Sequence, residues 1–314
     1  MESLQALKAR LGGIKNIRQI TKAMELVAAT KMRKSQEKAL ASRPYAFTAL
    51  HLLTTLSKLR DSELAASLSP LFIERTIKKT LVVVLTSDKG LAGSFNSSVL
   101  KAFDRFVAQE GISADSSSYS FLAIGNKALA HVKKFGAEPV ASFTRVGDYT
   151  TVTEVSPIAE FLISGFERGE FDRVVIFSTH FRNALKQDVL MRDLLPIKQK
   201  ALEALITEII PSTGRYSDAS PMPVENGSGD LLLEPSPEVL VESLGRHLVL
   251  TQVYHLVLEA NASEHAARRS AMKSASDNAK DLGERLTLQY NKSRQAAITK
   301  ELIEISAGTA SQGA

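Results

Sequence analysis

The residues most suggestive of chemistry lie in the stretch TSDKGLAGSFN at 86–96, between a β-branched apolar run and an amphipathic segment. A glycine-containing turn from a strand into a helix is where many nucleotide-binding domains hold a phosphate. The stretch matches neither GxxxxGK[ST] nor GxGxxG, so Gly90 and Gly93 are better explained as residues that shape a tight turn. Ser87 and Asp88 have no histidine near them, and the chain has no GxSxG elbow, so nucleophilic catalysis is not predicted here either.

Metal binding and thiol chemistry find no support in the sequence. The chain has no cysteine, which excludes disulfides, thiolate metal sites, cysteine nucleophiles and thiol redox switches. None of its six histidines belongs to a zinc-binding HExxH pattern, and we expect His247 and His255, beside apolar residues, to be packing or surface residues. The carboxylates are scattered, without a pair suited to acid–base catalysis. We therefore expect no catalytic residues, no metal and no cofactor.

A basic stretch near the N-terminus is the other chemically distinctive feature. The net charge of +5 and the pI of about 9.2 are mild, and do not by themselves indicate a nucleic-acid-binding protein. The stretch is therefore either an ordinary solvated helix face or a contact for an acidic partner. Its basic residues are Lys22, Lys31, Arg33, Lys34 and Lys38, and its acidic residues are Glu25 and Glu37.

Two long helices are expected to carry much of this surface. From about Glu238 to Ser306 there is no proline, and only the isolated glycines Gly245 and Gly283 weaken the helical pattern, each by about 1 kcal/mol relative to alanine. Such a helix would be on the order of 100 Å long. Its narrow heptad seam, which requires a close partner helix, consists of Met272, Ala275, Ala279, Leu282 and Leu286.

Residues 3–58 are predicted to form the partner helix. One heptad run is followed by a second that is offset by three residues, which is a stammer in the seam. Gly12 and Gly13 weaken this helix, and Pro44 should kink or interrupt it because its ring clashes with the preceding turn. The first run is Leu4, Leu7, Leu11 and Ile14, and the second is Ile17, Ile20, Met24 and Val27.

Between the two helices, short strands alternate with helices, which predicts a Rossmann-like α/β domain with a mostly parallel sheet. The expected strands are Leu81–Leu85, Tyr119–Ile124, Pro139–Phe143, Arg173–Ser178 and Val189–Leu195, and the expected helices are Phe95–Gln109, Lys127–Phe135 and Thr153–Arg168. The chain then divides into an N-terminal helix (1–58), a connector (59–79), the α/β domain (80–197), an extended loop or insert (198–235) with some helical character at 197–210, and a C-terminal helix (236–314).

The two terminal helices must leave and re-enter the same domain, so they can run antiparallel as a coiled coil. The C-terminal helix is roughly 15 residues longer, and should extend past its partner by about 20–25 Å as a single helix. Ala297, Ile298, Leu302 and Ile305 lie in that extension. Because a lone helix with apolar side chains is not stable in water, we expect another protein to surround it.

Both ends of the chain resemble the gamma subunit of F-type ATP synthases. IRQITKAMELVAATKMRKSQ at 17–36 and ASRPYA at 41–46 resemble its N-terminal helix, and the stretch from NASEHAARRSAMK to ELIEISAG at 261–308 is similar to its C-terminal helix. SDKGLAGSFN at 87–96 resembles the turn after the first strand of its α/β domain. With the order of elements, the likeness covers nearly the whole chain. Because the N-terminal motif begins within the first residues, we expect no transit peptide before it.

The resemblance implies a non-catalytic subunit that serves as the central rotor shaft of a proton-translocating ATP synthase. Its partners would be the alpha and beta subunits of the catalytic ring, the epsilon subunit and the c-ring of the membrane sector, with no nucleic acid. The longest clear apolar run, LVVVL at 81–85, is far short of the ~20 residues of a membrane span. We therefore expect a peripheral protein on the cytoplasmic face of a bacterial plasma membrane, without direct membrane insertion.

The resemblance also implies which residues meet the ring, in two groups. The first, here called the collar, would exchange torque with acidic loops of the beta subunits, and the second lies on the C-terminal helix. The collar consists of Lys22, Met24, Lys31, Arg33 and Lys34, and the second group of Arg268, Gln295, Ile298, Thr299, Glu301, Leu302 and Ile305.

The sequence departs from the family pattern at several points. Ala92 stands where many relatives have cysteine, and the dithiol regulatory segment of plastid relatives is missing. Residues 198–230 look longer than in compact relatives, and Leu231–Leu233 stand where aromatic residues are common in some of them, which bears on the expected c-ring contact.

Two other classes of protein remain as alternatives at this point. One is an architectural coiled-coil protein that uses its basic helix on nucleic acid, although the basic stretch has few aromatic residues. Salt-dependent DNA binding would favour it. The other is a Rossmann-like enzyme with helical arms, which nucleotide binding by the isolated chain would favour.

Overall fold

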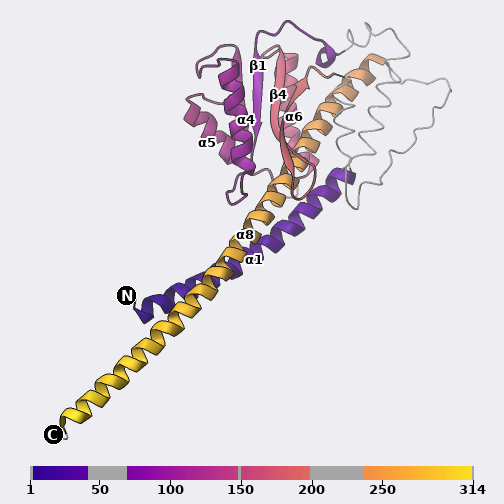
Figure 1. Cartoon of the computed structure of the whole chain (residues 1–314). Coiled ribbons are helices and arrows are strands. Elements are labelled where there is room, and N and C mark those ends of the chain that lie inside the picture. The colour runs from indigo at the N-terminus through magenta and orange to yellow at the C-terminus, as the bar shows by residue number, and fades with distance from the viewer. Residues whose placement is uncertain (1–2, 42–68, 148–149, 199–236, 313–314) are drawn as a thin grey trace. The chain divides into compact units, whose positions relative to one another are not determined.

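The computed structural model describes residues 3–41, 69–147, 150–198 and 237–312, and these fall into two compact units (Figure 1). One unit pairs Met1–Ala28 with Arg268–Ala314, and the other is Ala29–Ala267. The two long helices, α1 (Leu4–Ala41) and α8 (Pro237–Gln312), contribute to both units. Residues 42–58 of the predicted N-terminal helix with the expected kink at Pro44, residues 59–68 of the connector and the insert at 199–235 lie outside the described residues, so the predicted division of the chain stays a prediction.

A five-stranded sheet forms the centre of the Ala29–Ala267 unit. The first four strands are mutually parallel and the fifth runs antiparallel to the fourth, in the order β3-β2-β1-β4-β5. This confirms the expected mostly parallel sheet, and each predicted strand is found within a few residues of its expected bounds. The strands are β1 (Thr80–Leu85), β2 (Tyr119–Ile124), β3 (Ala141–Phe143), β4 (Arg173–Phe181) and β5 (Gln187–Leu195).

Helices cover both faces of this sheet, which is why β1 is buried along its whole length and apolar at every position after Thr80. Alternate residues of β1 enter two different cores, since successive side chains point to opposite faces. On one face Val82 and Val84 pack with α4 (Phe95–Gln109) and α5 (Asn126–Phe135). On the other face Leu81, Val83 and Leu85 pack with α6 (Val152–Glu167). A short 3₁₀ turn, η1 (Pro70–Phe72), adds Leu71 to this second core.

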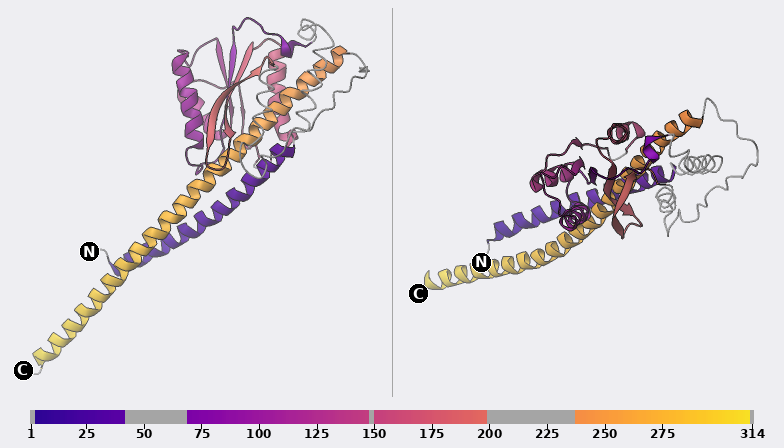
Figure 2. Two further views of the ribbon diagram at one scale, coloured as in Figure 1. Left: turned by 45° about the vertical axis from the view of Figure 1, so that its right-hand side comes forward. Right: turned by 90° about the horizontal axis from the view of Figure 1, so that it is seen from above.

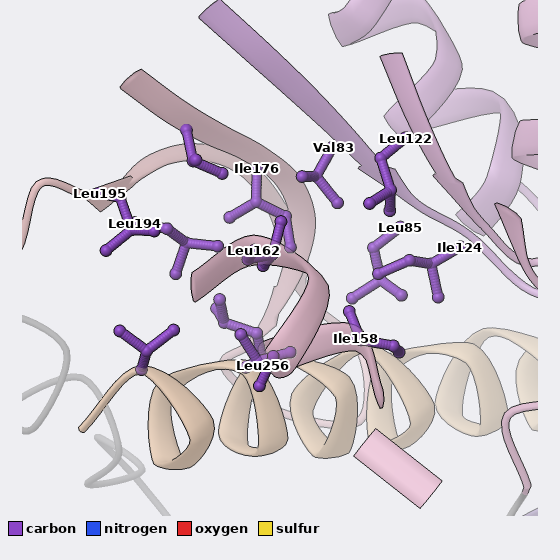
Figure 3. Packing of buried hydrophobic residues seen from close by; sticks show 14 of the residues in the cluster. Val83, Leu85, Leu122, Ile124, Ile158, Leu162, Ile176, Leu194, Leu195 and Leu256 are labelled. Carbon is purple, nitrogen blue, oxygen red and sulfur yellow. The ribbon is translucent and has the colours of Figure 1, made fainter. Parts of the chain in front are cut away.

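The second core also contains one stretch of α8. Leu248, Val249, Val253, Leu256 and Val257 are buried in it, and Figure 3 shows Leu256 beneath Leu162 of α6 and the sheet residues Val83 and Ile176. The sequence placed this stretch in a terminal helix separate from the α/β domain. Helical periodicity identifies an apolar face but not the element that covers it, so the dual role of α8 emerges only from the tertiary structure.

In the other unit, the ends of α1 and α8 run antiparallel and side by side (Figures 1 and 2). The expected heptad seam of α8 is correct at Met272, Ala279 and Leu286, which are buried, and wrong at Leu282, which is 44% exposed. The neighbouring Gly283 faces α1 instead, because a β-carbon there would lie 3.7 Å from Ile14 Cγ2. Because a heptad seam advances by 3.5 residues on average, either residue 282 or residue 283 can face the partner helix. The glycine at 283 is the smaller of the two and lets the helices approach closely.

The predicted stammer in α1 is wrong. The second run of apolar residues does not face the partner helix, since Ile17, Ile20 and Val27 are 53%, 59% and 54% exposed. The first heptad register resumes after the exposed Arg18, and most of its later positions are taken by small or polar residues that apolarity alone does not identify. After Leu4, Leu7, Leu11 and Ile14, the buried or half-buried members of that register are Thr21, Glu25, Ala28, Met32 and Ser35.

The expected single-helix extension of α8 is present. Antiparallel pairing that sets Ile14 against Gly283 brings Leu4, where α1 begins, level with about residue 293 of α8. Residues 294–312 therefore extend past α1 by roughly 28 Å at 1.5 Å per residue. Figure 2 shows this end of α8 reaching beyond the N-terminus in both views.

Candidate functional site

The turn after β1 is built to hold its own chain together and not to hold a phosphate. The first amide groups of α5, which would face an anion at a helix N-terminus, all have partners within the protein. Asn126 N donates to Asp88 Oδ1 (2.9 Å), Lys127 N to Ser87 O (3.2 Å) and Ala128 N to Thr86 Oγ1 (2.7 Å). The carboxylate of Asp88 thus occupies the position that a bound anion would need.

The backbone conformation beside this turn also restricts which residue can stand at position 125. Gly125 precedes α5 with φ of +91°, and a β-carbon there would lie 2.2 Å from the carbonyl oxygen of Thr86, so only glycine fits. The second oxygen of Asp88 accepts a hydrogen bond from Arg145 N at 2.8 Å, which ties the loop after β3 to the same point. A cavity of about 410 Å³ adjoins the turn, but the backbone amides at the start of α5 beside it are already used. This arrangement counts against nucleotide binding.

The collar residues lie on α1 with different exposures. The side chains of Lys22, Arg33 and Lys34 are exposed, whereas those of Met24 and Lys31 are half-buried. Lys22 Nζ lies 2.9 Å from Glu25 Oε2, and Arg33 Nε lies 3.0 Å from Glu37 Oε1. Exposed ion pairs of this kind contribute only about 0–1 kcal/mol, so neither pair removes its cation from reach of another protein.

The residues expected on the C-terminal helix divide by exposure. Arg268 is only 9% exposed and lies in the interior of this chain, so its expected ring contact stays a prediction. The others stand on the extended end of α8, where Thr299 Oγ1 donates to the carbonyl of Gln295 in its own helix (2.9 Å). The exposed fractions of the three aliphatic residues are 49% for Ile298, 61% for Leu302 and 65% for Ile305, and Gln295 and Glu301 are also exposed. The structure therefore presents a bare apolar helix end.

Comparison with known proteins identifies the family of proteins to which a chain with such a helix end belongs. A family model described as ATP synthase matches residues 3–311. The ATP synthase gamma chain of Geotalea daltonii is 39% identical over 99% of this chain and 99% of its own length, and that of Chlorobium limicola is 36% identical over 98% of both. The chain belongs to the ATP synthase gamma chain family.

Solved structures of the family share the fold. A chain from the central stalk and c-ring of the Tetrahymena thermophila mitochondrial ATP synthase superposes with a TM-score of 0.58 at 25% identity, covering 82% of this chain and 99% of its own. A chain of the Euglena gracilis mitochondrial ATP synthase gives a TM-score of 0.62 at 20% identity over 98% of this chain and 94% of its own. In the part of this gamma chain that the structure describes, no helix is long and apolar enough to cross a membrane.

The gamma-chain structure contains a buried polar cluster that sequence reasoning missed. Glu259 of α8 is buried, and His180 Nδ1 of β4 lies 3.0 Å from Glu259 Oε1. His255 Nε2 is 3.4 Å from the same oxygen, and Arg192 Nη2 of β5 is 3.6 Å from Glu259 Oε2. His255 was expected to be a packing or surface residue. It is buried, but it also belongs to this cluster. The spacing of His255 and Glu259 by one helical turn was the available signal, although His180 and Arg192 are far away in the sequence.

This cluster keeps Glu259 ionised. Burial by itself raises the pKa of a carboxyl group, but the hydrogen bond from His180 and the proximity of His255 and Arg192 outweigh it and lower the pKa of Glu259 to about 2. Among the described residues, no group of three or more His, Cys, Asp or Glu side chains is arranged to hold a metal. The cluster is therefore an ionic link between α8 and the sheet.

Glu259 should make the stability of this gamma chain sensitive to acid. Because its folded-state pKa lies below the ordinary glutamate value, its contribution is present above about pH 4.5 and is lost as the pH falls towards 2. The difference corresponds to about 3 kcal/mol. We expect Glu259→Gln to lower the thermal unfolding temperature at pH 7, and to show a smaller further decrease between pH 4.5 and 2 than the unchanged protein.

The matched control for this prediction is Asp277→Asn, which removes an exposed carboxylate from the same helix. The measurement is the unfolding temperature by circular dichroism across the pH series. If Glu259→Gln and Asp277→Asn gave the same curve, the ionic link would contribute nothing.

Proposed function

We propose that this chain is the central rotor shaft, the gamma subunit, of a proton-translocating ATP synthase. It would couple ion flow through the membrane sector to ATP synthesis in the alpha/beta ring without catalysing a reaction itself. The observation that carries the proposal is the extended end of α8, a single helix with exposed Ile298, Leu302 and Ile305 in a chain that matches gamma chains over its whole length. Such a helix needs an apolar surrounding, and the bore of a ring provides one.

The exposed apolar face of α1 supports the same proposal. Ile17, Ile20 and Val27 are each more than half exposed and lie within about 80° of one another around the helix, and contiguous apolar surface of this kind marks an interaction site. We propose that these residues, with the collar, face the ring, so that apolar contacts centre the shaft. The collar cations would meet acidic loops of successive beta subunits, since complementary charge attracts without requiring one large fixed interface.

The remaining partners follow from the same assignment. The related solved structures are a central stalk with its c-ring and an F1 sector with OSCP and a c-ring. We propose that this chain likewise binds the epsilon subunit and the c-ring through its α/β domain, with the sequence around Leu231–Leu233 adding to the c-ring contact, as a peripheral protein on the cytoplasmic face of a bacterial plasma membrane. The deciding experiment is purification of the tagged chain from membranes, with identification of the co-purifying subunits. Recovery without alpha, beta and c subunits would overturn the proposal.

The isolated chain should have no ATPase activity. The motif for a phosphate loop is missing, and the amide groups at the start of α5 are occupied by the protein's own oxygens. We expect turnover by the purified chain at the level of a buffer blank, and activity when alpha and beta subunits are added. Turnover that co-elutes with the isolated chain and disappears in its Asp88→Ala variant would contradict this expectation.

A further inference from the structure

Thr150 is a point at which three elements of the Ala29–Ala267 unit are joined by hydrogen bonds. It lies in the segment that enters α6, and its side chain is fully buried. Its carbonyl oxygen accepts a hydrogen bond from Lys38 Nζ of α1 at 3.1 Å and one from the Tyr254 hydroxyl of α8 at 3.5 Å. Thr150 therefore connects both long helices to the α/β domain.

The side chain of Thr150 strengthens the connection to α8. Asn261 Nδ2 donates to Thr150 Oγ1 at 2.8 Å and to the carbonyl oxygen of Gly147 at 3.2 Å. Thr150 Oγ1 in turn donates to the same Gly147 oxygen at 2.7 Å. One amide group of α8 is thus held by two oxygens of one loop.

Glu259 holds α8 from a different side. Its partners His180 and Arg192 belong to β4 and β5, whereas the partners of Asn261 belong to the loop before α6. Two residues of an α-helix separated by two positions point about 200° apart around its axis. The hydrogen bonds of Asn261 and the ionic link of Glu259 therefore grip nearly opposite faces of α8 within one turn.

Contacts on opposite faces resist rotation of a helix about its axis more than contacts on one face do. The apolar contacts of Leu248, Val253 and Leu256 oppose a large rotation of the helix, which would expose these buried side chains, but they are not directional and tolerate a small one. Hydrogen bonds depend on distance and angle, so they are lost when the helix turns. The two-sided grip is thus suited to transmit torque between the domain and the helix.

We propose that Thr150, Asn261 and Glu259 form a clamp that passes torque between the α/β domain and the long helices. This inference rests on the proposed rotor function. The clamp residues are positioning residues, because we propose only that they fix α8 against the α/β domain while torque passes between them. When the clamp is weakened, the ring should still hydrolyse ATP and turn α8, but α8 should slip relative to the α/β domain when ion pumping opposes the rotation.

The first test is Asn261→Ala in the complete ATP synthase in inverted membranes. Thr150 Oγ1 keeps its bond to Gly147 in this variant, so no buried hydroxyl loses all its partners. We expect ATP hydrolysis close to that of the unchanged enzyme, and a ratio of proton pumping to hydrolysis at least twofold lower at a steep proton gradient. Thr251→Ala is the matched control, since Thr251 Oγ1 donates to His247 O in its own helix. An unchanged ratio with Asn261→Ala would overturn the proposal.

The second test restores the link covalently. The chain has no cysteine, so Thr150→Cys with Asn261→Cys introduces its only two thiols at side chains that touch in the structure. We expect a lowered ratio when the thiols are reduced and recovery after oxidation to a disulfide, whereas a purely structural defect would not recover. A ratio that stays low in protein with a confirmed disulfide would overturn the clamp. Absence of any pumping by the unchanged enzyme would instead contradict the rotor function itself.

Discussion

Deleting residues 298–314 should reduce assembly of the chain with the alpha/beta ring by more than about tenfold, whereas deleting 309–314 should have almost no effect. The longer deletion removes Ile298, Leu302 and Ile305, which are about half to two-thirds exposed in the isolated chain. Full burial of a side chain of this size is worth about 1.5–3 kcal/mol, so completing the burial of three of them is worth roughly 3–5 kcal/mol. Since 1.4 kcal/mol corresponds to a tenfold change in affinity, the loss should be easy to detect.

The measurement is the yield of complex after mixing each chain with alpha and beta subunits, followed by gel filtration. A length-preserving variant in which Ile298, Leu302 and Ile305 are all changed to serine separates the loss of apolar contacts from the loss of helix length. We expect it to assemble as poorly as the longer deletion. Equal yields for the two deletions would mean that the end of α8 does not enter an apolar bore.

Reversing the charge of Lys31, Arg33 and Lys34 to glutamate should lower ATP-driven proton pumping more than ATP hydrolysis. The three residues lie within one turn of α1 and point in different directions around it, as suits a contact that meets successive acidic loops. One exposed ion pair contributes only about 0–1 kcal/mol, so a single change should do little. The triple reversal replaces attraction by repulsion at each position of the rotor.

The fold should survive this reversal. Arg33 and Lys34 are exposed and Lys31 is half-buried, and the change at Arg33 sets two carboxylates one helical turn apart, since Glu37 is its present partner. Such like-charge pairs destabilise a helix by only a few tenths of a kcal/mol.

Pumping and hydrolysis are to be measured on the same membranes at low and high salt, because screening weakens both attraction and repulsion. The matched control reverses Lys101, Arg105 and Lys134, which are exposed on α4 and α5 and give the same change in net charge. If pumping and hydrolysis fell in strict proportion, or if the control behaved like the collar variant, the collar would be an ordinary solvated surface.

Local sequence was enough to predict the types and order of the described elements. The β-branched run at β1, the amphipathic period of α4 and the absence of proline from 238 to 306 each specify one kind of backbone. These signals are local, because side-chain periodicity and backbone sterics act over a few residues. The similarity of both ends to gamma subunits then identified the family, which the comparisons confirm.

The tertiary structure decided which of several possible faces is buried. Ile17, Ile20 and Val27 looked like a continuation of the α1 seam, but the seam follows Thr21, Glu25 and Ala28, while the apolar stripe is exposed. The backbone of a helix has the same local energy whichever face is buried, so the face that is buried depends on the partner helix. We propose that the apolar stripe contacts the ring, which a single chain does not contain.

The polar links between distant segments were likewise beyond sequence reasoning. His180 and Glu259 are 79 residues apart, and Lys38 and Thr150 are 112 residues apart. Each of these residues is unremarkable by itself, since a lone histidine or lysine on a helix or strand is usually a surface residue. Burial in one folded arrangement gives the Glu259 cluster its lowered pKa and the Thr150 junction its connections. The sequence by itself therefore determined the elements and the family, and only packing decided how α8 is gripped, because hydrogen bonds and charges gain their strength from neighbours that the fold brings together.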